Sequence, residues 1–349
     1  MTNNNFEQAL SFDDVMLIPR LSKINTRSNV DLSTSIAGIK LKIPIIAANM
    51  SSVCEQQMAM TLGELGGLGI IHRMCDVKDQ MSMVISASDK QLPDYSVGFS
   101  IGIGSDWCDR MDACKNHADI VCLDVAHAHH QRVLDLLKKY FEIYQNYPII
   151  IGQVATINAV KDILNVIPEK YYSSIAFKTS IGGGSLCTTR IKTGFGIPTL
   201  QAVMNIRKEF PKISIIADGG IRESGDIVKS LALGANAVML GNLLAGTEES
   251  PGGIIKGNDG KLLKIYRGSS SYGDKSLRGE EVKNIEGEEM LVSYKGSVIR
   301  VVNGLLDGIR SGFSYGGAIN IKELQDNIEF IQITTAGIKE SQPHGIFNL

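Results

Sequence analysis

A cysteine follows a run of glycines in the segment "TSIGGGSLCTTRIKTGFG", which extends from Thr179 to Gly196. Small residues let backbone N–H groups approach a ligand closely, which suits the binding of an anion. The thiol of Cys187 becomes a nucleophile once it loses its proton. The segment therefore indicates either a nucleophile beside a phosphate site or a plain turn between a strand and a helix.

The other residues that could bind a metal do not support a metal site. The chain has six scattered cysteines and no CxxC pair, which indicates neither a zinc site nor a disulfide framework. His127, His129 and His130 in "DVAHAHH" also lack the spacing of a ligand set, so we interpret them as solvated loop residues. The case for Cys187 depends on where the fold places it.

Eight short apolar segments could form the framework that positions these residues. They centre on Ile45, Ile70, Phe99, Cys122, Ile150, Phe177, Ile215 and Met239. Short continuous apolar runs are typical of strands buried on both faces of a parallel sheet. Segments of helical length separate them, the clearest being 130–145 with its apolar stripe. This alternation favours an α/β fold, a closed (β/α)8 TIM barrel, with an open doubly wound sheet as the alternative.

In such barrels the active site lies at the carboxyl ends of the strands. Seven of the eight apolar segments are followed by residues that could contact a ligand. These are Asn49 and Met50, His72 and Arg73, Asp124 and His127, Gln153 and Thr156, the segment that carries Cys187, Asp218 to Gly220, and Gly241 with Asn242. The last two loops occupy the place where many barrels bind a phosphate. Asp124 could bind a ribose or cap the backbone, and Asp218 could likewise be a helix cap.

The rest of the chain is interpreted as part of one barrel domain over residues 1–349. Residues 247–297 are rich in glycine, serine and charge, which predicts either a lid or a disordered connection. Two weaker amphipathic patterns follow, at 301–309 and 324–333. No GxGxxG follows the first apolar segment, which counts against a Rossmann-type nicotinamide site.

The charge balance predicts the kind of partner. The formal net charge is −2 and the sequence pI is about 6.3, so no overall field attracts nucleic acid or an anionic membrane. The sequence also shows no basic leader followed by an apolar run and no apolar segment of membrane-spanning length. We therefore expect a cytoplasmic protein without nucleic-acid or membrane partners.

Several separated motifs resemble the IMP dehydrogenase and GMP reductase family, in the same order. They are "LSFDDVMLIPR", "PIIAANM", "CLDVAH", "CTTRIKTGFG", "ADGGIR", "MLGNLLAGTEE" and "YKG". The resemblance covers nearly the whole chain. It implies a (β/α)8 barrel, usually a homotetramer, that binds a purine nucleoside monophosphate and a nicotinamide cofactor at the carboxyl face of the barrel.

The resemblance also implies roles for individual residues. Cys187 would attack C2 of the purine ring, and Thr189 with Glu286 would supply the acid for the leaving group. The nucleotide would contact Met50, Ser185, Asp218, Gly219, Gly220, Gly241, Asn242, Tyr266, Gly268, Ser269 and Gly287. The cofactor would contact Arg73, Asp124, Val125, Ala126, Ile181 and Gly182. Backbone carbonyls of Gly182, Gly184 and Cys187 would be the ligands of a monovalent cation such as K⁺.

The reductase branch of the family fits the sequence better than the dehydrogenase branch. The segment "SASDKQLPDYS" leaves no room for the CBS modules that dehydrogenases usually carry, and 247–297 lacks their water-activating Arg-Tyr pair. Lys192 in "CTTRIKTG" also matches the reductases, whereas "AGTEESPG" and the tail resemble dehydrogenases. We expect an NADPH-dependent GMP reductase; the alternatives are an NAD-dependent IMP dehydrogenase without CBS modules and a weakened nucleotide-binding homologue.

Four positions depart from the family pattern. Gly183 replaces a proline, Ser51 an aspartate, Gln153 an asparagine and Ser269 a methionine. The glycine predicts a looser catalytic loop, and the serine at 269 predicts a changed contact with the base. An altered nucleotide preference or a lower activity would follow.

Overall fold

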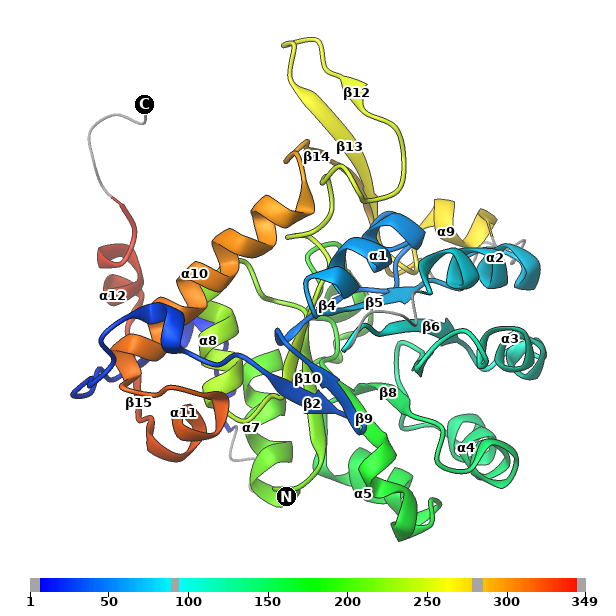
Figure 1. Ribbon diagram of the computed structural model, residues 1–349, viewed down its shortest axis with the longest axis horizontal. Helices are drawn as coiled ribbons and strands as arrows, with labels where there is room; N and C mark the ends of the chain where they lie inside the picture. The colour runs from blue at the N-terminus through cyan, green and yellow to red at the C-terminus, as the bar shows by residue number, and fades with distance from the viewer. Residues whose placement is uncertain (1–6, 89–93, 278–284, 344–349) are drawn as a thin grey trace.

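The structure is a computed structural model, and it describes residues 7–88, 94–277 and 285–343. Eight parallel strands close into a barrel, in the order β4 to β11 with β11 paired to β4 (Figure 1). They are β4 (Ile45–Ala47), β5 (Leu68–Ile71), β6 (Val97–Ile101), β7 (Ile120–Asp124), β8 (Ile149–Val154), β9 (Ile175–Thr179), β10 (Ser214–Asp218) and β11 (Ala237–Leu240). Each predicted apolar segment forms one strand, so the (β/α)8 prediction is confirmed and the open sheet is wrong.

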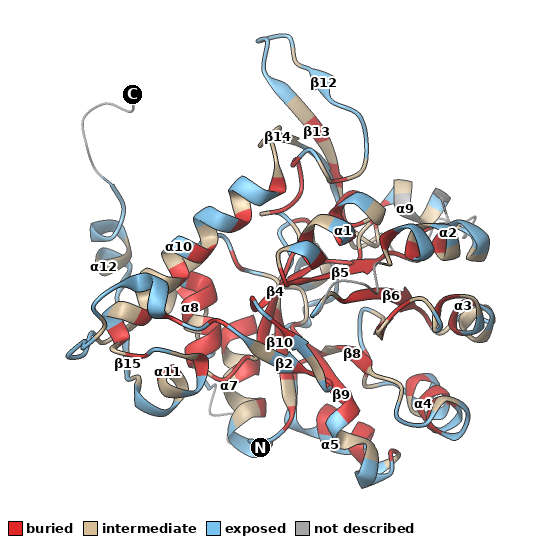
Figure 2. Cartoon of the chain, in the orientation of Figure 1, coloured by how far each residue is buried: buried red, intermediate tan, exposed pale blue. Residues whose placement is uncertain are grey.

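Helices follow the strands and cover the outside of the barrel. They are α1 (Gln56–Glu64), α2 (Val77–Ala87), α3 (Trp107–Cys114), α4 (Gln131–Tyr144), α5 (Ile157–Asn165), α7 (Thr199–Glu209), α8 (Ser224–Ala232) and α10 (Val298–Gly316). The predicted stripe on α4 is buried against the barrel, and the opposite face of this helix is exposed (Figure 2). Burial of one face of each helix explains why amphipathic segments separate fully apolar ones along the chain.

Strand alternation divides the buried residues between two cores. Alternate residues of a strand point to opposite faces, so every second side chain points into the barrel. One core is this interior and includes Cys122, Ile150, Ala176 and Ile216. The larger core lies between the strands and the helices, and it includes Val121, Leu123, Ile151, Phe177 and Ile215. The residues two positions beyond the interior set therefore face the mouth of the barrel.

Short strands and helices outside the barrel strands complete the fold. The hairpin of β2 (Thr34–Ile36) and β3 (Ile39–Leu41) contributes to the interior core. The strand β1 (Val15–Leu17) pairs with β15 (Phe330–Gln332). The remaining short helices are η1 (Phe12–Asp14), η2 (Arg27–Asn29), η3 (Glu169–Ser174), α6 (Thr189–Thr193), α11 (Ile321–Asn327) and α12 (Thr335–Glu340). The pattern at 301–309 belongs to α10, whereas the pattern at 324–333 is not one helix, because α11 ends and β15 follows within it.

The predicted lid is structured where it is described. After β11 the chain forms a three-stranded antiparallel sheet of β12 (Ile255–Lys256), β13 (Leu262–Arg267) and β14 (Glu289–Ser293), which projects from the barrel at the top of Figure 1. The helix α9 (Tyr272–Leu277) follows β13. Residues 278–284 of this segment lie outside the described residues. Within the described part of the chain, no helix combines the length and the apolarity that a membrane crossing requires.

Candidate active site

A cavity of about 670 Å³ lies at the carboxyl ends of the barrel strands. Every residue to which the sequence analysis gave a role in catalysis or in binding nucleotide, cofactor or cation lines it, except Ile181. Ile181 instead forms an isolated bridge with Ile197. The cavity thus brings together residues that are far apart in the sequence, while their individual roles remain predictions.

Three other polar residues at the strand ends, His72, His127 and Thr156, do not line the cavity. His72 is buried, with its Nε2 3.1 Å from Glu55 Oε1 and its Nδ1 accepting the N–H of Met74. Thr156 caps the first turn of α5. His127 is exposed, and the described residues contain no group of His, Cys, Asp and Glu that could hold a metal ion.

The floor of the cavity is the last inward-facing layer of the barrel. Asp124, Gly152, Lys178 and Asp218 each stand two residues beyond a member of the interior core, on four neighbouring strands. Lys178 Nζ is 2.7 Å from Asp124 Oδ1 and 2.9 Å from Asp218 Oδ2. Neither aspartate acts as a helix cap here: both bind the ammonium.

Buried charges of opposite sign dominate this floor. The side chain of Lys178 is only 4% exposed, and those of Asp124 and Asp218 are 14% and 17% exposed. Burial alone would lower the pKa of Lys178, but the two carboxylates outweigh it and raise that pKa. Burial alone would raise the pKa of Asp124, but the charge and hydrogen bond of Lys178, together with Arg73 and Asn49, outweigh burial and lower that pKa. The floor therefore holds Asp124 ionised.

Cys187, the predicted nucleophile, lies at the rim of the cavity and is followed by two polar partners in line. Cys187 Sγ donates to Thr189 Oγ1 at 3.1 Å, and Thr189 Oγ1 donates to Glu286 Oε2 at 2.5 Å. The sequence separates Thr189 from Glu286 by 97 positions. The geometry connects a thiol to a carboxylate through one hydroxyl, which is a route for a proton.

Backbone hydrogen bonds hold the lid against the catalytic loop. The N–H of Thr188 donates to the carbonyl of Glu286 at 2.9 Å, and the N–H of Glu288 donates to the carbonyl of Leu186 at 3.0 Å. Lys192 Nζ also donates to the carbonyl of Ile285 at 2.6 Å. These bonds place Glu286 beside Thr189, so the relay depends on the lid and the loop together.

The environment separates Cys187 from the other thiols. Burial raises the pKa of Cys54, Cys75, Cys108, Cys114 and Cys122, to about 11 for Cys75 and about 12 for Cys114. A higher pKa leaves less thiolate at neutral pH and so a less reactive side chain. Cys187 lines the cavity and none of these five does. This favours Cys187 as the nucleophile among the six.

Arg190 bonds to both ends of the loop that carries Cys187, at Ile181 and Ile197. Its Nε donates to the carbonyl of Ile181 at 3.0 Å and its Nη2 to that of Ile197 at 2.7 Å. A Cβ on Gly182, which has φ of +72°, would lie 2.5 Å from Arg190 Cγ. Only glycine therefore fits at 182, both for its backbone conformation and for its contact with the arginine.

The space beside Gly183 is filled by two hydroxyl groups. Thr199 Oγ1 donates to Ser180 Oγ at 3.1 Å, and both residues are buried. A Cβ on Gly183 would lie 2.5 Å from Ser180 Oγ and 2.8 Å from Thr199 Oγ1. The glycine that replaces the family's proline is therefore matched by its neighbours, which leave no room for a side chain.

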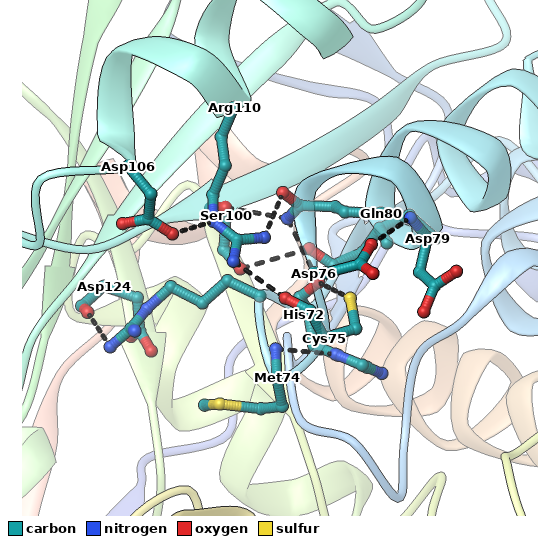
Figure 3. A network of polar contacts seen from close by, with 12 residues as sticks. His72, Met74, Cys75, Asp76, Asp79, Gln80, Ser100, Asp106, Arg110 and Asp124 are labelled. Atoms are coloured by element: carbon teal, nitrogen blue, oxygen red, sulfur yellow. Dashed lines mark hydrogen bonds and ion pairs between the residues drawn. The ribbon is translucent and has the colours of Figure 1, made fainter. Parts of the chain in front are cut away.

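A buried network holds the loop that carries Arg73 (Figure 3). Arg110 of α3 donates to the carbonyl of Cys75 at 2.8 Å and to Gln80 Oε1 at 2.9 Å. Gln80 of α2 in turn donates to the carbonyl of His72 at 3.1 Å. Because these two carbonyls flank Arg73, the network fixes the backbone from which its side chain extends.

Arg73 lies at the end of the cavity predicted to bind the cofactor. Its Nη2 is 3.4 Å from the carbonyl oxygen of Asp124, and its Nε is buried without a hydrogen-bond partner among the described residues. Buried donors normally have a partner, so this end of the cavity suits a further polar ligand. Val125 and Ala126 line the same cavity. The residues fit a nicotinamide dinucleotide, whose contacts here remain a prediction.

The predicted cation site fits less well. The carbonyl of Gly184 already accepts the N–H of Cys187 at 3.0 Å. The guanidinium of Arg190 donates to the carbonyl of Ile181 and packs against Gly182, so a fixed positive charge lies beside the proposed ligands. We therefore derive no catalytic step through a monovalent cation.

Sequence reasoning missed several residues that line the cavity, including Lys178, Ser180, Arg190, Thr199 and Arg222. A signal for Lys178 was present, because a lysine inside the apolar run "SIAFKTS" must have a buried charge partner. Arg222, paired with Asp13, joins the N-terminal segment to the loop after β10. Its contact spans 209 positions, and no local pattern predicts it.

The fold and the site define a (β/α)8 oxidoreductase with a cysteine at the rim of a nucleotide-sized cavity. The family of the IMP dehydrogenase / GMP reductase domain matches residues 9–344. The chain belongs to this family, whose members act on purine nucleotides with a nicotinamide cofactor.

Known relatives include enzymes with both activities. The IMP dehydrogenase of Borreliella burgdorferi is 34% identical over 100% of both chains, and that of Cryptosporidium parvum is 34% identical over 99% of this chain and 97% of its own. The GMP reductase of Leishmania donovani is 28% identical over 98% of both chains. A crystal structure of a GMP reductase variant from Trypanosoma brucei with guanosine 5'-monophosphate matches with a TM-score of 0.90 and 25% identity, over 98% of this chain and 99% of the other.

The relatives remove one argument for the reductase. The alignments with the two named IMP dehydrogenases extend over 411 and 399 positions, against 349 residues in this chain. The alignment with the Leishmania GMP reductase extends over 488 positions. A relative named IMP dehydrogenase can therefore be short and one named GMP reductase long, so the absence of a CBS insertion does not distinguish the two activities.

Proposed function

We propose that this protein is an NADPH-dependent GMP reductase, which converts GMP to IMP and ammonia. The observation that carries the proposal is the line of hydrogen bonds from Cys187 through Thr189 to Glu286. It combines a nucleophile with an acid that can protonate a leaving amine, which are the two groups that reductive deamination requires.

The relay accounts for both proton transfers of the proposed reaction. As the thiol of Cys187 attacks C2 of GMP, its proton passes through Thr189 Oγ1 to Glu286. The same proton then returns to the 2-amino group, the C2–N bond breaks, and ammonia leaves a covalent thioimidate on Cys187. When bound, NADPH supplies the hydride that enters at C2. The C2–S bond then breaks and releases IMP and the thiolate, which regains a proton from solvent.

The lid favours reduction over hydrolysis. An IMP dehydrogenase must activate water to release its product from the cysteine, and the dehydrogenases of the family place an Arg-Tyr pair in the lid for this step. Residues 247–297 contain no Arg-Tyr dipeptide. In the described part of the lid, Gly287 forms a bridge with Cys187, and Glu286 accepts the hydrogen bond of Thr189. Together these features support a site that transfers a proton without a dedicated water-activating base.

One observation favours the second candidate, an NAD-dependent IMP dehydrogenase. The relatives at 34% identity carry that name, while the Leishmania GMP reductase is 28% identical. The identities are too low to decide between the activities. The Cys187 relay would serve either reaction in its first step, so the activity must be measured.

An absorbance assay at 340 nm tests the proposal directly. We expect GMP with NADPH to lose absorbance with release of ammonia, and IMP with NAD to give no increase. Turnover of IMP with NAD in the absence of turnover of GMP would overturn the reductase assignment. Tight nucleotide binding without either reaction would support a weakened homologue. Light scattering in the same buffer tests the homotetramer that the family resemblance implies.

A further inference from the structure

Lys178 is a buried lysine whose two partners belong to different ends of the cavity. Asp124 of β7 lies beside Arg73 at the predicted cofactor end, and Asp218 of β10 begins the glycine loop at the predicted nucleotide end. We propose that Lys178 is a positioning residue that pairs with both carboxylates and orients them, and so serves nucleotide and cofactor together. The inference rests on the proposed assignment of the two ends, though not on the choice between reductase and dehydrogenase.

The strand register explains how one ammonium reaches two strands. Gly152 of β8 is paired with Asp124 on one side and with Lys178 on the other. A Cβ on Gly152 would lie 2.6 Å from Lys178 Cβ and 3.0 Å from its Cε. The lysine side chain therefore passes directly over Gly152 to reach Asp124. The missing side chain at 152 is the space that this bridge requires.

The ammonium of Lys178 balances the charge of Asp124 and Asp218. Two carboxylates that bind the same ammonium at 2.7 and 2.9 Å must lie close together. Without a cation between them, close carboxylates do not both stay ionised, and one takes up a proton. Gln153 Nε2 donates to Asp218 Oδ2 at 2.5 Å, which is a neutral contact and cannot replace the charge. A protonated Asp218 would lose acceptor capacity for ribose hydroxyls.

The surrounding groups leave Lys178 as the main counter-charge of Asp218. Arg73, after β5, acts on Asp124. Cys122 of β7 lies below the ammonium, where burial raises its pKa, and Tyr266 of β13 lies near Asp218, where burial likewise raises its pKa. Both groups are therefore neutral near pH 7. Removal of the lysine would leave Asp124 with Arg73 and Asp218 without a cation.

The test measures nucleotide binding by calorimetry, with GMP and IMP as separate probes and no cofactor. For Lys178→Met we expect affinity to fall at least about tenfold at neutral pH, because a charge-assisted contact to a ligand-binding carboxylate is lost. Affinity of the variant should rise with pH as the shared proton leaves, whereas the native protein should show no such rise. Lys178→Gln, which keeps a hydrogen-bond donor without its charge, gives the same test if the methionine variant does not fold.

A second substitution separates positioning from mere stability. In Lys178→Met with Asp124→Asn, the competing carboxylate is gone, so Asp218 should ionise again. Nucleotide affinity should then recover severalfold and lose its pH dependence. Loss of packing alone would make the double variant no better than the single one. Gly152→Ala, which pushes the lysine away from Asp124, should reproduce part of the single variant's effect.

Lys264→Met is the matched control. Lys264 is 2% exposed, but its ammonium binds the backbone carbonyls of Thr247 and Ser250 at 3.1 and 2.5 Å. Its removal deletes a buried lysine without leaving two carboxylates together, so we expect no pH-dependent loss of nucleotide affinity. Native affinity and a flat pH profile in Lys178→Met would overturn the inference, as would no recovery in the double variant. Failure of the native protein to bind GMP or IMP would instead overturn the proposed function.

Discussion

The floor and the rim of the cavity are built in different ways. The floor consists of side chains at the ends of barrel strands, and its main contacts are buried ion pairs between Lys178, Asp124 and Asp218. The rim consists of the catalytic loop and the lid, which meet through backbone hydrogen bonds and a line of three polar side chains. Under the proposed function, the floor would orient the two ligands, and the loop and the lid would bring the reacting groups together.

The comparison is sharpest for the two thiols near the cavity. Cys187→Ala should abolish turnover, on the order of a 10⁵-fold loss, because no other group on the rim can form the covalent bond. Cys122→Ala, in the interior just below the floor, should keep most of the turnover and lower stability by about 1 kcal/mol. Steady-state rates and thermal melts of the two variants check this. Equal losses of turnover would contradict this difference between floor and rim.

The relay predicts the next largest effect. Glu286→Gln should lower kcat roughly 10²- to 10⁴-fold, since the amide cannot take the proton of Cys187 or return it to the leaving group. Glu288→Gln is the control, because Glu288 lies in the same lid segment with an exposed side chain. Single-turnover measurements would locate the defect in formation of the covalent intermediate. A normal rate of that step in Glu286→Gln would remove Glu286 from the mechanism.

An alanine in the left-handed backbone region should be tolerated only where no neighbouring atom occupies the position of its Cβ. Gly182 and Gly194 have φ of +72° and +76°, so alanine costs similar backbone strain at both. At Gly182 the new Cβ also meets Arg190, whereas at Gly194 it meets nothing within 4 Å. We therefore expect a ten- to hundredfold lower kcat for Gly182→Ala, and a much smaller change for Gly194→Ala, because displacing the loop misplaces Cys187. Similar rates for the two variants would show that the contact with Arg190 is unimportant.

Alkylation distinguishes the rim thiol from the buried ones without a mutation. With a pKa of about 11, Cys75 has about one thiolate per thousand molecules at pH 8, and Cys54, Cys114 and Cys122 are also buried. Iodoacetamide should therefore modify Cys187 first, and a bound purine nucleotide should protect it. Raising the pH toward the higher pKa values should bring in the other thiols. Peptide mapping by mass spectrometry gives the order of modification.

The same contrast explains which parts could be predicted from the sequence. The strands were predictable because each is a short apolar run, and Asp124 and Asp218 were found because they end such runs. Lys178 was missed although alternation from Ala176 points it inward, because it lies within an apolar run, whereas the predicted site residues follow such runs. The relay needed the family resemblance, since Thr189 and Glu286 lie 97 positions apart and meet through a contact between the lid and the loop.

The departure at Gly183 gives the smallest predicted effect. A proline or alanine there would place a Cβ against the hydroxyls of Ser180 and Thr199, which now bind each other in that space. Gly183→Ala should therefore lower kcat by about three- to tenfold, because a small displacement of the loop carries over to Cys187. Adding Ser180→Ala and Thr199→Ala removes both hydroxyls and should restore most of the rate. If the triple variant stays slow, the glycine is needed for the path of the backbone itself, and the neighbouring hydroxyls are not a compensation for the lost proline.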